Sequence, residues 1–440
     1  MTGRYKVYAE TKNSNTEWLG EVPTHWVVSK FAYVKTVLTD YTANGSFADL
    51  KKNVTYKDEP SFARLVRLTD LRRDLDNDGV WIDEGAYNYL KKSALFGGEF
   101  LLANVGAYAG LFYQMPYNKG AASLAPNMFM AKFSETKILP LFMAYVGQCD
   151  PINKQLTLNA TASSAQPKLN KDDFKSIKFC YPPLIEQQKI ANFLDHETAK
   201  IDTLITKQEK LIELLKEKRQ AVISHAVTKG ISYKGQPNAP MKDSGVEWLG
   251  EVPEHWRIVK LSYFLKLLSG DGITSNQIEA EGKYPVMGGN GLRGFTTNYN
   301  CNGEYALIGR QGALCGNINL ATGKFFASEH AVVVYPYTDF NLTFLSEFLR
   351  FMNLGQYSVS AAQPGISVER INGLKIAIPP LDEQTNIGDE IKDCTDKFDT
   401  LTIKAKTMIE ALKERKTALI SAAVTGKIDV RDWQPHGVQG

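Results

Sequence analysis

A glycine-rich segment is the first part of the chain whose residue types and spacing could do chemistry. Residues 289–294 read GNGLRG and match G-x-G-x-x-G, a motif that cradles a pyrophosphate where a strand ends and a helix begins. KYPVM (283–287) could form the strand, but FTTNYNCNGEY, which follows the motif, has no helical pattern. We therefore expect a loop that presents Asn290 and Arg293, and no nucleotide site.

An acidic run offers a second candidate, because Asp74, Asp76, Asp78 and Gly79 match the first half of a calcium-binding loop. Such a loop needs a bidentate glutamate at its twelfth position. That position is Gly85 in this chain, and Glu84 stands one place early. The segment is therefore expected to be an acidic surface turn.

Catalytic motifs of DNA-modifying enzymes are missing from the sequence. CDPINK (149–154) comes nearest to the N/D-P-P-F/Y loop of an adenine methylase, but it lacks the second proline and the aromatic residue. There is no G-x-x-x-x-G-K-[ST] phosphate loop, and the six histidines show no metal-binding spacing. Glu390 and Lys392 have a nuclease-like spacing, yet Ile391 between them falls on a helical seam. The sequence predicts a protein that is not an enzyme and binds no metal or cofactor itself.

The composition is that of an ordinary globular protein, with 43% apolar and 22% charged residues among 440. This length predicts two to four domains. No apolar run could cross a membrane and the N-terminal segment has no signal-peptide pattern, so we expect a cytoplasmic protein. Five scattered cysteines predict free thiols, and a net charge of +3 does not by itself call for nucleic acid.

Three phrases occur twice, and they show how the chain is organised. EWLGEVPTHW (17–26) returns as EWLGEVPEHW (247–256), PPLIEQ (182–187) as PPLDEQ (379–384), and LKEKRQAVISHAVTKGI (215–231) as LKERKTALISAAVTGKI (412–428). Each copy thus has fixed ends around a different insert, roughly 27–162 and 257–359. We predict one scaffold that carries two different readers and is pseudo-two-fold symmetric, like a homodimer fused into one chain.

A long helix is predicted after each Pro-Pro pair, since proline fits the first turn and a glutamate follows near the N-terminus. Steps of four and three residues through both segments meet mostly apolar residues, which is the pattern of a coiled-coil seam. Because both helices carry the same seam, we expect them to pack on each other, antiparallel; packing of each helix on its own domain is the alternative. The predicted seam residues are Leu194, Ile201, Leu204, Leu211 and Leu215 in the first helix, and Ile391, Phe398, Leu401, Met408 and Leu412 in the second.

Short apolar runs split by Gly, Asn and Asp fill both inserts, as in GEFLLANVGAYAG (98–110) and AVVVYP (331–336), and they predict strands with loops at their edges. The predicted fold class is α+β: two strand-rich α/β domains separated by two long antiparallel coiled-coil helices. The predicted boundaries are 1–181 for the N-terminal segment and first domain, 182–228 for the first helix, 229–246 for a linker, 247–378 for the second domain, 379–428 for the second helix and 429–440 for a C-terminal tail.

These features together resemble the DNA-specificity subunit of type I restriction-modification systems. The resemblance is carried by the paired variable inserts, the PPLIEQ and PPLDEQ helix starts, the KEKRQAVISHAVTKG-like helix ends and GEYALIGRQGALCG (303–316). Inside the inserts, KYPVMGGNGLRGF (283–295) and the aligned segments LLANVGAYAG and LIGRQGALCG also carry it. It covers essentially the whole chain.

The resemblance implies that each insert is a target-recognition domain, which reads one half of a split, asymmetric sequence in double-stranded DNA. The two helices would hold the domains at a fixed spacing and dock two methyltransferase subunits, which use S-adenosylmethionine. Two restriction and translocation subunits, driven by ATP with Mg²⁺, would then join, and this chain would catalyse nothing. A helix of about 41 residues rises roughly 60 Å, or about 18 base pairs. Removing four residues from both helices is therefore expected to shorten the unspecified spacer.

Base contacts are expected from glycine-rich loops with forked donors, since Arg suits guanine and Asn or Gln suits adenine. The candidates are Asn290, Arg293, Arg310 and Gln311 in the second domain, Asn104 and Tyr108 in the first, and Arg64, Arg67, Lys91 and Lys92 as phosphate or base contacts. Frame roles are expected for two further sets. One is the pairs Gln166-Pro167 and Gln363-Pro364, for which DNA contact is the less favoured alternative, and the other is the buried anchors Trp18, Trp26, Trp248 and Trp256.

A second hypothesis from another class stays open, a coiled-coil scaffold that gathers protein partners and reads no DNA. The two hypotheses differ in one observable. A reader would direct methylation by its partner subunits to one bipartite site, whereas a scaffold would leave that methylation independent of sequence.

Overall fold

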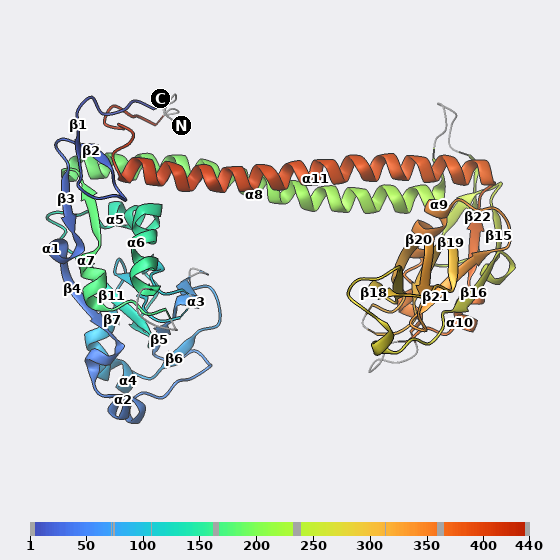
Figure 1. Ribbon diagram of the computed structural model, residues 1–440, viewed down its shortest axis with the longest axis horizontal. Coiled ribbons are helices and arrows are strands. Elements are labelled where there is room, and N and C mark those ends of the chain that lie inside the picture. Colours follow the sequence, from blue (N-terminus) through green and yellow to red (C-terminus); the bar gives the residue numbers. More distant parts are fainter. Residues whose placement is uncertain are drawn as a thin grey trace. The chain divides into compact units, whose positions relative to one another are not determined.

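The computed structural model describes residues 5–71, 73, 75–106, 108–161, 167–231, 239–312, 314–358 and 365–435. The chain divides into two compact units, Met1–Lys207 with Met408–Gly440, and Gln208–Thr407. Each unit contains one of the predicted domains and a part of both long helices, α8 (Leu184–Lys229) and α11 (Leu381–Val424) (Figure 1). None of the described helices is both long and apolar enough to cross a membrane.

Two four-stranded sheets form the first domain. One is antiparallel and has the order β4-β11-β8-β9, with β4 at Lys35–Asp40, β11 at Met128–Phe133, β8 at Phe100–Ala103 and β9 at Phe112–Gln114. The other has the order β6-β5-β10-β7, with β6 at Val80–Ile82, β5 at Ala63–Val66, β10 at Ala122–Leu124 and β7 at Ala94–Leu95. Its central strands β5 and β10 run parallel, and this pair leads to the candidate site.

Short helices complete the first domain. They are α1 (Phe31–Val34), η1 (Tyr41–Asn44), α2 (Phe47–Asn53), α3 (Leu68–Leu71), α4 (Glu84–Tyr89), η2 (Lys91–Ser93), α5 (Pro140–Gln148), α6 (Asp150–Thr161) and α7 (Lys171–Ser176). A capping box opens α7, in which the Asn170 side chain accepts from the backbone of Asp173 and the Asp173 side chain accepts from the backbone of Asn170.

One six-stranded sheet forms the second domain. Its order is β16-β21-β19-β20-β17-β18, with β16 at Leu265–Ser269, β21 at Ala331–Pro336, β19 at Cys301–Gly309, β20 at Ile318–Ala327, β17 at Tyr284–Gly288 and β18 at Gly291–Thr296. The short helices are η3 (Leu261–Tyr263), η4 (Ser275–Gln277), α9 (Leu342–Phe351), η5 (Leu354–Tyr357) and α10 (Val368–Asn372). The order β16-β21-β19-β20 repeats β4-β11-β8-β9, so the two domains share a core that their dissimilar sequences did not reveal.

The repeated phrase EWLGEVPxHW forms the same frame in both units. It supplies the second strand of a small hairpin, β1 (Thr11–Asn13) with β2 (Glu21–Pro23), and β13 (Met241–Asp243) with β14 (Glu251–Pro253). A further strand follows each phrase and pairs antiparallel with the strand before a long helix, β3 (Val27–Lys30) with β12 (Lys178–Tyr181), and β15 (Arg257–Lys260) with β22 (Lys375–Ile378).

The glutamate of each PPLxEQ helix start binds the end of that phrase. In the first unit, Glu186 Oε1 accepts from Trp26 Nε1 at 2.9 Å, and its Oε2 lies 2.8 Å from His25 Nε2. In the second unit, Glu383 Oε1 accepts from Trp256 Nε1 at 3.0 Å, and its Oε2 lies 2.6 Å from His255 Nε2. The repeated phrases and helix starts thus form the same Glu–Trp–His contact in each unit, which explains why these residues recur.

Burial of the four repeated tryptophans differs along the phrase. Trp26 and Trp256 are fully buried, which confirms them as anchors. Trp248 is partly buried and packs on Phe348, whereas the indole of Trp18 is 37% exposed, so its prediction as a buried anchor is wrong. Trp18 lies in the turn between β1 and β2.

Each phrase also contacts the end of the helix from the other copy. Lys427 Nζ donates to Leu19 O at 2.9 Å, and a Cβ on Gly426 would lie 2.3 Å from Pro23 Cδ. In the second unit, Lys229 Nζ donates to the backbone oxygen of Glu251. The small residue and the lysine at the helix ends therefore belong to the frame.

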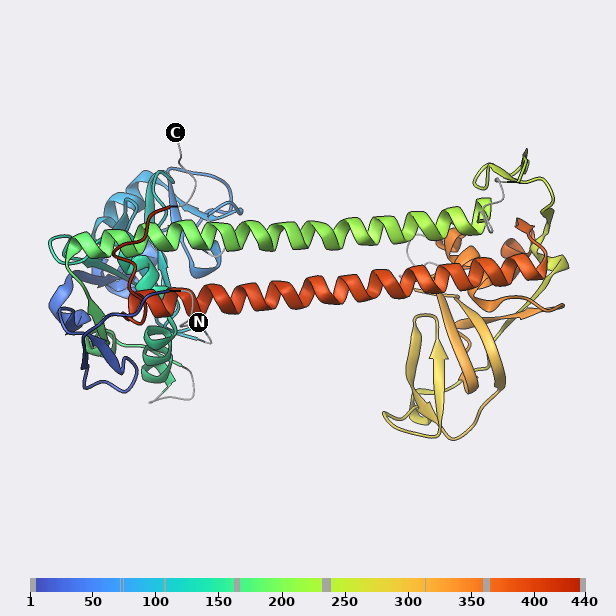
Figure 2. The same cartoon turned by 90° about the horizontal axis from the view of Figure 1, so that it is seen from above.

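Within each unit the start of one long helix lies beside the end of the other. In the first unit, Ile190, Leu194 and Ile201 share a core with Leu412 and Leu419, and Figures 1 and 2 both show the end of α11 along the start of α8 there. Lys416 Nζ also binds Asp202 at 2.7 Å. In the second unit, the end of α8 shares a core with the start of α11. The helices thus pack on each other, and their first turns pack on their own domains as well.

One of the two predicted rows of the seam is correct and the other is displaced by one residue. Leu194, Ile201 and Leu215 in α8 and Ile391 and Leu412 in α11 are buried, and Phe398 is partly buried. Leu204, Leu211, Leu401 and Met408 are instead between 41% and 51% exposed, and Thr198, Ile205, Ile212, Thr402 and Ile409 take the inner positions. Adjacent apolar pairs such as Leu204-Ile205 fit either row of a heptad, so the pattern alone could not choose between them.

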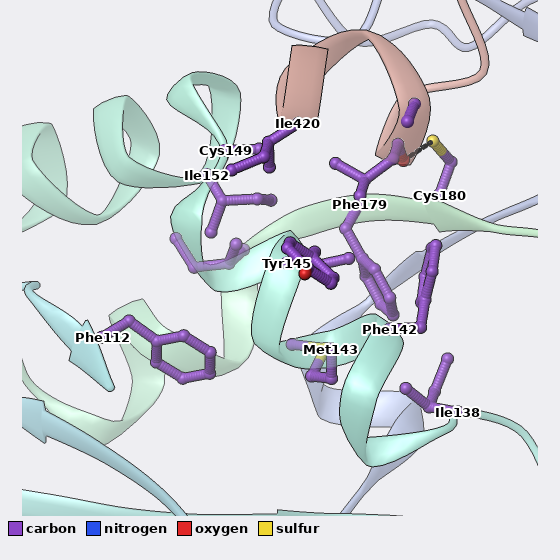
Figure 3. Close-up of a cluster of buried hydrophobic side chains, with 14 of the residues drawn as sticks. Phe112, Ile138, Phe142, Met143, Tyr145, Cys149, Ile152, Phe179, Cys180 and Ile420 are labelled. Carbon is purple, nitrogen blue, oxygen red and sulfur yellow. Dashed lines mark hydrogen bonds between the residues drawn. The ribbon is translucent and has the colours of Figure 1, made fainter. Parts of the chain in front are cut away.

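The core of the first unit joins the domain to the end of α11. Figure 3 shows Ile420 of α11 beside Cys149 and Ile152, and the Cys180 thiol against the backbone oxygen of Val424 at 3.8 Å. All five cysteines are free, as predicted. Burial raises the pKa of the Cys149 thiol to about 12, so this sulfur acts as a packing group.

The ends of the predicted linker and tail belong to the folded units. Strand β13 falls inside the predicted linker 229–246 and pairs with β14. The ordered structure that contains the second domain therefore starts before residue 247. The predicted tail 429–440 contains Asp429, whose N–H donates to Lys6 O at 2.8 Å, and Trp433, which packs edge-on against Phe193. Neither segment has the apolar spacing of a helix, and strands of two or three residues are too short to be recognised from sequence. The sequence therefore predicted a linker and a tail.

Candidate nucleic-acid interface

A loop with the same backbone structure follows β8 in the first domain and β19 in the second. Gly110 N donates to Ala103 O at 2.8 Å, and Gly316 N donates to Gly309 O at 2.7 Å. Four glycines take positive φ at equivalent places, Gly106 and Gly110 at 93°, Gly312 at 88° and Gly316 at 87°. A Cβ there would be strained, which explains why the glycines recur while the residues between them differ.

The first residue of each loop is held by backbone hydrogen bonds on both sides. Asn104 N donates to Asn127 O at 3.0 Å, and Arg310 N donates to His330 O at 2.9 Å. Their carbonyls accept in turn from Leu169 N at 2.9 Å and from Ile366 N at 3.0 Å. The scaffold thus fixes the backbone at this position and leaves the side chain to vary.

A parallel strand pair ends at the same edge in both domains. β5 and β10 are paired through Leu124 and Val66, and β17 and β20 through Ala327 and Met287. The next hydrogen bond is also shared, Ala125 N to Val66 O at 3.0 Å and Ser328 N to Met287 O at 2.9 Å. Asn127 and His330 follow directly, so the strand ends and the glycine loop meet at one place.

In the second domain this edge contains a groove. Its lining includes Asn290, Leu292, Arg293, Gln311, Leu314 and His330, from the tip of the β17–β18 hairpin, the glycine loop and the turn after β20. A Cβ on Gly309 would lie 2.4 Å from Gly289 O, so glycine lets the hairpin tip approach the loop. Three of the four predicted residues therefore line one surface, and Arg310 stands next to it at the start of the loop.

Polar side chains connect the walls of this groove. His330 Nε2 lies 3.0 Å from Glu329 Oε1, and His330 Nδ1 lies 3.2 Å from Gln311 Oε1. Arg293 approaches the same carboxylate, with 4.0 Å between its nitrogen and Glu329 Oε1. Asn290 Oδ1 accepts from Asn317 Nδ2 at 3.2 Å. The groove thus offers donors and acceptors of the kind that contact base edges.

The glycine-rich motif is a hairpin turn. Residues 289–290 connect β17 to β18, which are paired antiparallel from Tyr284 with Thr296 to Gly288 with Gly291. No helix begins there. Asn290 lies in the turn, as expected, whereas Arg293 lies in strand β18 and not in a loop.

Arg64 has a structural role in the first domain, which corrects its prediction as a DNA contact. Its side chain is buried, and its guanidinium donates to Leu75 O at 2.6 Å and Asn77 O at 2.9 Å. A Cβ on Gly79 would lie 2.6 Å from Arg64 Nε, so the acidic segment after α3 wraps closely around this arginine. The side chain of Arg64 points into the domain, and the spacing of residues in the sequence does not indicate this direction.

Arg67 is half exposed at the end of β5 and binds the buried Asp70. Its Nε and a terminal nitrogen lie 3.2 and 3.0 Å from the two carboxylate oxygens. Burial acts to raise the pKa of Asp70, but hydrogen bonds from Arg67 and Asn77 outweigh it and leave that pKa lowered. The side chain at this edge is therefore held in one orientation, with part of the guanidinium at the surface.

The other candidates of the first domain lie at two places. Lys91 and Lys92 are exposed in η2, where Lys92 Nζ donates to Ala43 O at 3.2 Å. Tyr108 is 52% exposed on the glycine loop, and Asn104 Oδ1 is buried with no hydrogen-bond partner in the described part of the chain. Nothing tests their contact with DNA, which stays a prediction.

Several predicted features fall partly outside the described residues. Asp74 of the acidic run is one of them, while Asp76 binds Lys119 at 3.3 Å. Gln166, Gln363 and Pro364 are also outside, and Pro167 O accepts from Gly106 N at 2.9 Å, which ties that segment to the glycine loop.

Sequence reasoning missed Asn127, Glu329 and His330. The available signal was position, because each lies in a polar turn between two apolar strands, APN before MFMAKF and SEH before AVVVYP. Asn127 has a positive φ of 63°, which asparagine tolerates better than most residues. Only the strand pairing shows that these turns meet the glycine loops.

Comparison with known proteins identifies relatives of this chain. The pattern of the family described as type I restriction modification DNA specificity domain matches residues 44–214 and 253–411, more than half of the chain. The type I restriction enzyme EcoprrI specificity subunit of Escherichia coli is 41% identical over 146 residues, 32% of this chain and 35% of that protein. The EcoKI specificity subunit of Escherichia coli strain K12 is 20% identical over 472 residues, 94% of this chain and 91% of that one.

Solved structures share the fold. A chain from the structures on complex assembly and conformational transition of the type I R-M system has a TM-score of 0.65 at 16% identity, over 92% of this chain and 99% of that one. The HsdS subunit of Thermoanaerobacter tengcongensis has a TM-score of 0.54 at 15% identity, over 92% and 98%. With the family pattern present in both domains, the chain belongs to the type I restriction-modification DNA specificity family and is a specificity subunit of such a system.

Proposed function

We propose that this subunit reads one bipartite, asymmetric DNA site, with each domain reading one half. The observation that carries the proposal is the pair of equivalent glycine loops. Their backbones are fixed by the same hydrogen bonds, but the first residue is Asn104 in one and Arg310 in the other. Side chains that vary on a fixed backbone suit base reading, because the base-edge pattern of the major groove is matched by side-chain type.

The two long helices set the length of the unspecified spacer and dock two methyltransferase subunits. Support for docking comes from Leu204 and Leu211 of α8 and Leu401 and Met408 of α11, which leave the inner seam and are between 41% and 51% exposed. Large apolar side chains on an otherwise charged helix surface suit burial by a partner subunit. Two restriction and translocation subunits complete the assembly, which acts on DNA in the cytoplasm.

The chain itself is a non-catalytic subunit. S-adenosylmethionine is used by the methyltransferase subunits, and ATP and Mg²⁺ by the restriction subunits. The near-neutral net charge of +3 fits a subunit that shares the phosphate contacts with its partners.

Methylome sequencing tests this function directly. The chain would be expressed with its methyltransferase subunit in a host that lacks adenine methylation, and methylated adenines would be located across the genome. We expect one motif with two specified halves and a fixed gap. Methylation without sequence preference would contradict the proposal and favour the scaffold hypothesis.

The spacer role has its own test, in which one heptad is removed from each helix, Gln208–Leu214 from α8 and Thr402–Met408 from α11. Seven residues keep the seam in phase and shorten each helix by about 10 Å, or about three base pairs. The deletions also remove Leu211 and Met408, so binding of the methyltransferase subunits is checked first by co-purification. In complexes that retain these subunits, the methylated motif should keep both halves and lose about three positions of gap. An unchanged gap in an active complex would show that the helices do not set the spacing.

A further inference from the structure

His330 stands where a residue could vary without disturbing the scaffold. Its backbone oxygen accepts from Arg310 N, as the backbone oxygen of Asn127 accepts from Asn104 N in the first domain. The scaffold therefore uses only the main chain at this position. The side chains differ, histidine in one domain and asparagine in the other, and both can donate and accept hydrogen bonds.

The imidazole of His330 is oriented by its two neighbours. Glu329 Oε1 lies 3.0 Å from Nε2 and, as a carboxylate oxygen, can only accept, so Nε2 carries a proton. Glu329 is itself held, because its Oε2 accepts from Ile273 N at 3.3 Å and Arg293 lies 4.0 Å from its Oε1. The ring is thereby directed so that Nδ1 faces Gln311 at 3.2 Å.

This arrangement determines which edge Gln311 presents. The structure places Gln311 Oε1 next to Nδ1, and a half-turn of the amide exchanges its oxygen and nitrogen; we assign the turned orientation, in which Nε2 of Gln311 faces Nδ1. In the neutral ring Nδ1 is an acceptor and takes one N–H of the Gln311 amide. The oxygen and the second N–H of that amide then remain available on the groove side. One acceptor beside one donor is the pattern that pairs bidentately with N6 and N7 of adenine in the major groove.

We propose that His330 is a specificity-determining residue of the second domain, which positions Gln311 to read an adenine in the second half-site. The inference rests on the proposed function, because it presupposes that the domain reads DNA. His330 acts through Gln311 and through Glu329 beside it. None of the three has a counterpart with the same side chain in the loop of the first domain, where Val105 stands in place of Gln311 and Asn127 in place of His330.

The experiment compares His330→Leu, His330→Asn and Gln311→Ala in the complex with methyltransferase subunits, by methylome sequencing of cells that express each variant. Gln311→Ala and His330→Leu should both weaken the preference at one and the same A·T position of the second half-site, by roughly tenfold. His330→Asn keeps an acceptor next to Gln311 and should retain most of that preference. The first half-site should be unchanged in all three, and the other positions of the second half-site should be unchanged too, which reports that the substituted domain folds.

Asn127→Gly is the matched control, because it removes the side chain at the equivalent place in the other domain and glycine tolerates the φ of 63° there. It should leave the second half-site unchanged. The inference is overturned if His330→Leu leaves the motif intact, if its effect falls on a G·C position, or if both half-sites weaken together. Sequence-independent methylation by the wild-type complex would instead overturn the proposed function, and with it the reading role of His330.

Discussion

The two domains solve the same structural problem with different residues next to the glycine loop. After β5, the first domain continues into α3 and a turn that wraps around the buried Arg64 and Asp70. After β17, the second domain turns straight back as β18, and glycine at 289 and 309 lets the hairpin tip lie on the loop. The first edge is stiffened by buried charge and the second by close backbone approach.

This difference shows which parts of a reading domain are free to change. The central strand order, the glycine φ angles and the hydrogen bonds to residues 104 and 310 are the same. The segment that follows the parallel strand pair differs in length, secondary structure and charge. The shared strand order therefore supports two different segments at the same edge.

The largest predicted effect tests whether the shared frame is equally strong in both units. Glu186 is 8% exposed and accepts from Tyr8 at 2.6 Å, from Trp26 and from His25, whereas Glu383 is 24% exposed and binds Trp256 and His255. Glu186→Ala leaves two buried partners, Tyr8 and Trp26, unpaired and should lower the free energy of unfolding by about 3–5 kcal/mol. Glu383→Ala should cost about 1–2 kcal/mol, because only one of its partners, Trp256, is buried while His255 is exposed.

Urea unfolding of the full chain, with hydrogen exchange to assign the loss to one unit, measures both changes. Glu186→Gln serves as the control, since the amide keeps an acceptor for Trp26 and should lose less than the alanine variant. Equal costs for Glu186→Ala and Glu383→Ala would mean that burial does not distinguish the two anchors.

The second effect tests the corrected phase of the seam. Ile201 is 4% exposed and Leu204 is 45% exposed, although the sequence predicted both as seam residues. Ile201→Ala should destabilise the first unit by about 2–4 kcal/mol through lost burial and an unfilled cavity. Leu204→Ala should change its stability by less than about 0.5 kcal/mol.

The same pair separates stability from assembly. If the exposed leucines dock a methyltransferase subunit, Leu204→Ala should weaken co-purification of that subunit while Ile201→Ala acts mainly on unfolding. A large loss of stability from Leu204→Ala would mean that Leu204 is part of the packed seam, as the sequence predicted.

The organisation of the chain could be predicted from sequence because repetition and heptad spacing are encoded locally. The helix after each Pro-Pro, one full seam row and the buried Trp26 and Trp256 follow from such local patterns. The second seam row could not, since Leu204-Ile205 satisfies either choice. The groove could not be predicted either, because Asn290, Gln311 and His330 meet only through the pairing of β17 with β20 and β19 with β21.

Arg64 shows the same limit from the other direction. A basic residue in a strand was predicted to contact DNA, but the direction of a strand side chain depends on which face the sheet buries. Its neighbours Ala63 and Leu65 are buried too, so the strand is covered on both faces and alternation gives no signal.

The third prediction concerns the side chain at the shared position 104/310. Arg310→Asn gives the second domain the residue that the first domain carries. If Arg310 contacts a guanine, the preference at one G·C position of the second half-site should fall by about 1–3 kcal/mol, with the first half-site unchanged. Asn104→Ala is the reciprocal control and should change only the first half-site. Methylome sequencing measures both, and a change in both half-sites from one substitution would mean that the loops do not read separately.

The smallest predicted effect is a pH dependence that belongs to the first domain, a contribution to stability that is present at neutral pH and is lost in acid. Hydrogen bonds from Arg67 and Asn77 outweigh burial and lower the pKa of Asp70 in the folded state. A lowered folded pKa means that the carboxylate stabilises the fold above the unfolded pKa of about 3.9, and that this contribution disappears as the pH falls through the folded value.

Asp70→Asn should therefore reduce the stability of the first unit at neutral pH, and the difference from wild type should shrink below about pH 4. Among the described residues of the second domain no carboxylate is buried to the same degree, so the second unit should lack this acid-dependent step. Urea midpoints from pH 3 to pH 7, resolved by unit through hydrogen exchange, measure it. A difference that stays constant down to pH 3 would mean that the Arg67–Asp70 pair contributes packing alone, and the contrast between a charge-stiffened edge and a glycine-packed edge would then rest on shape.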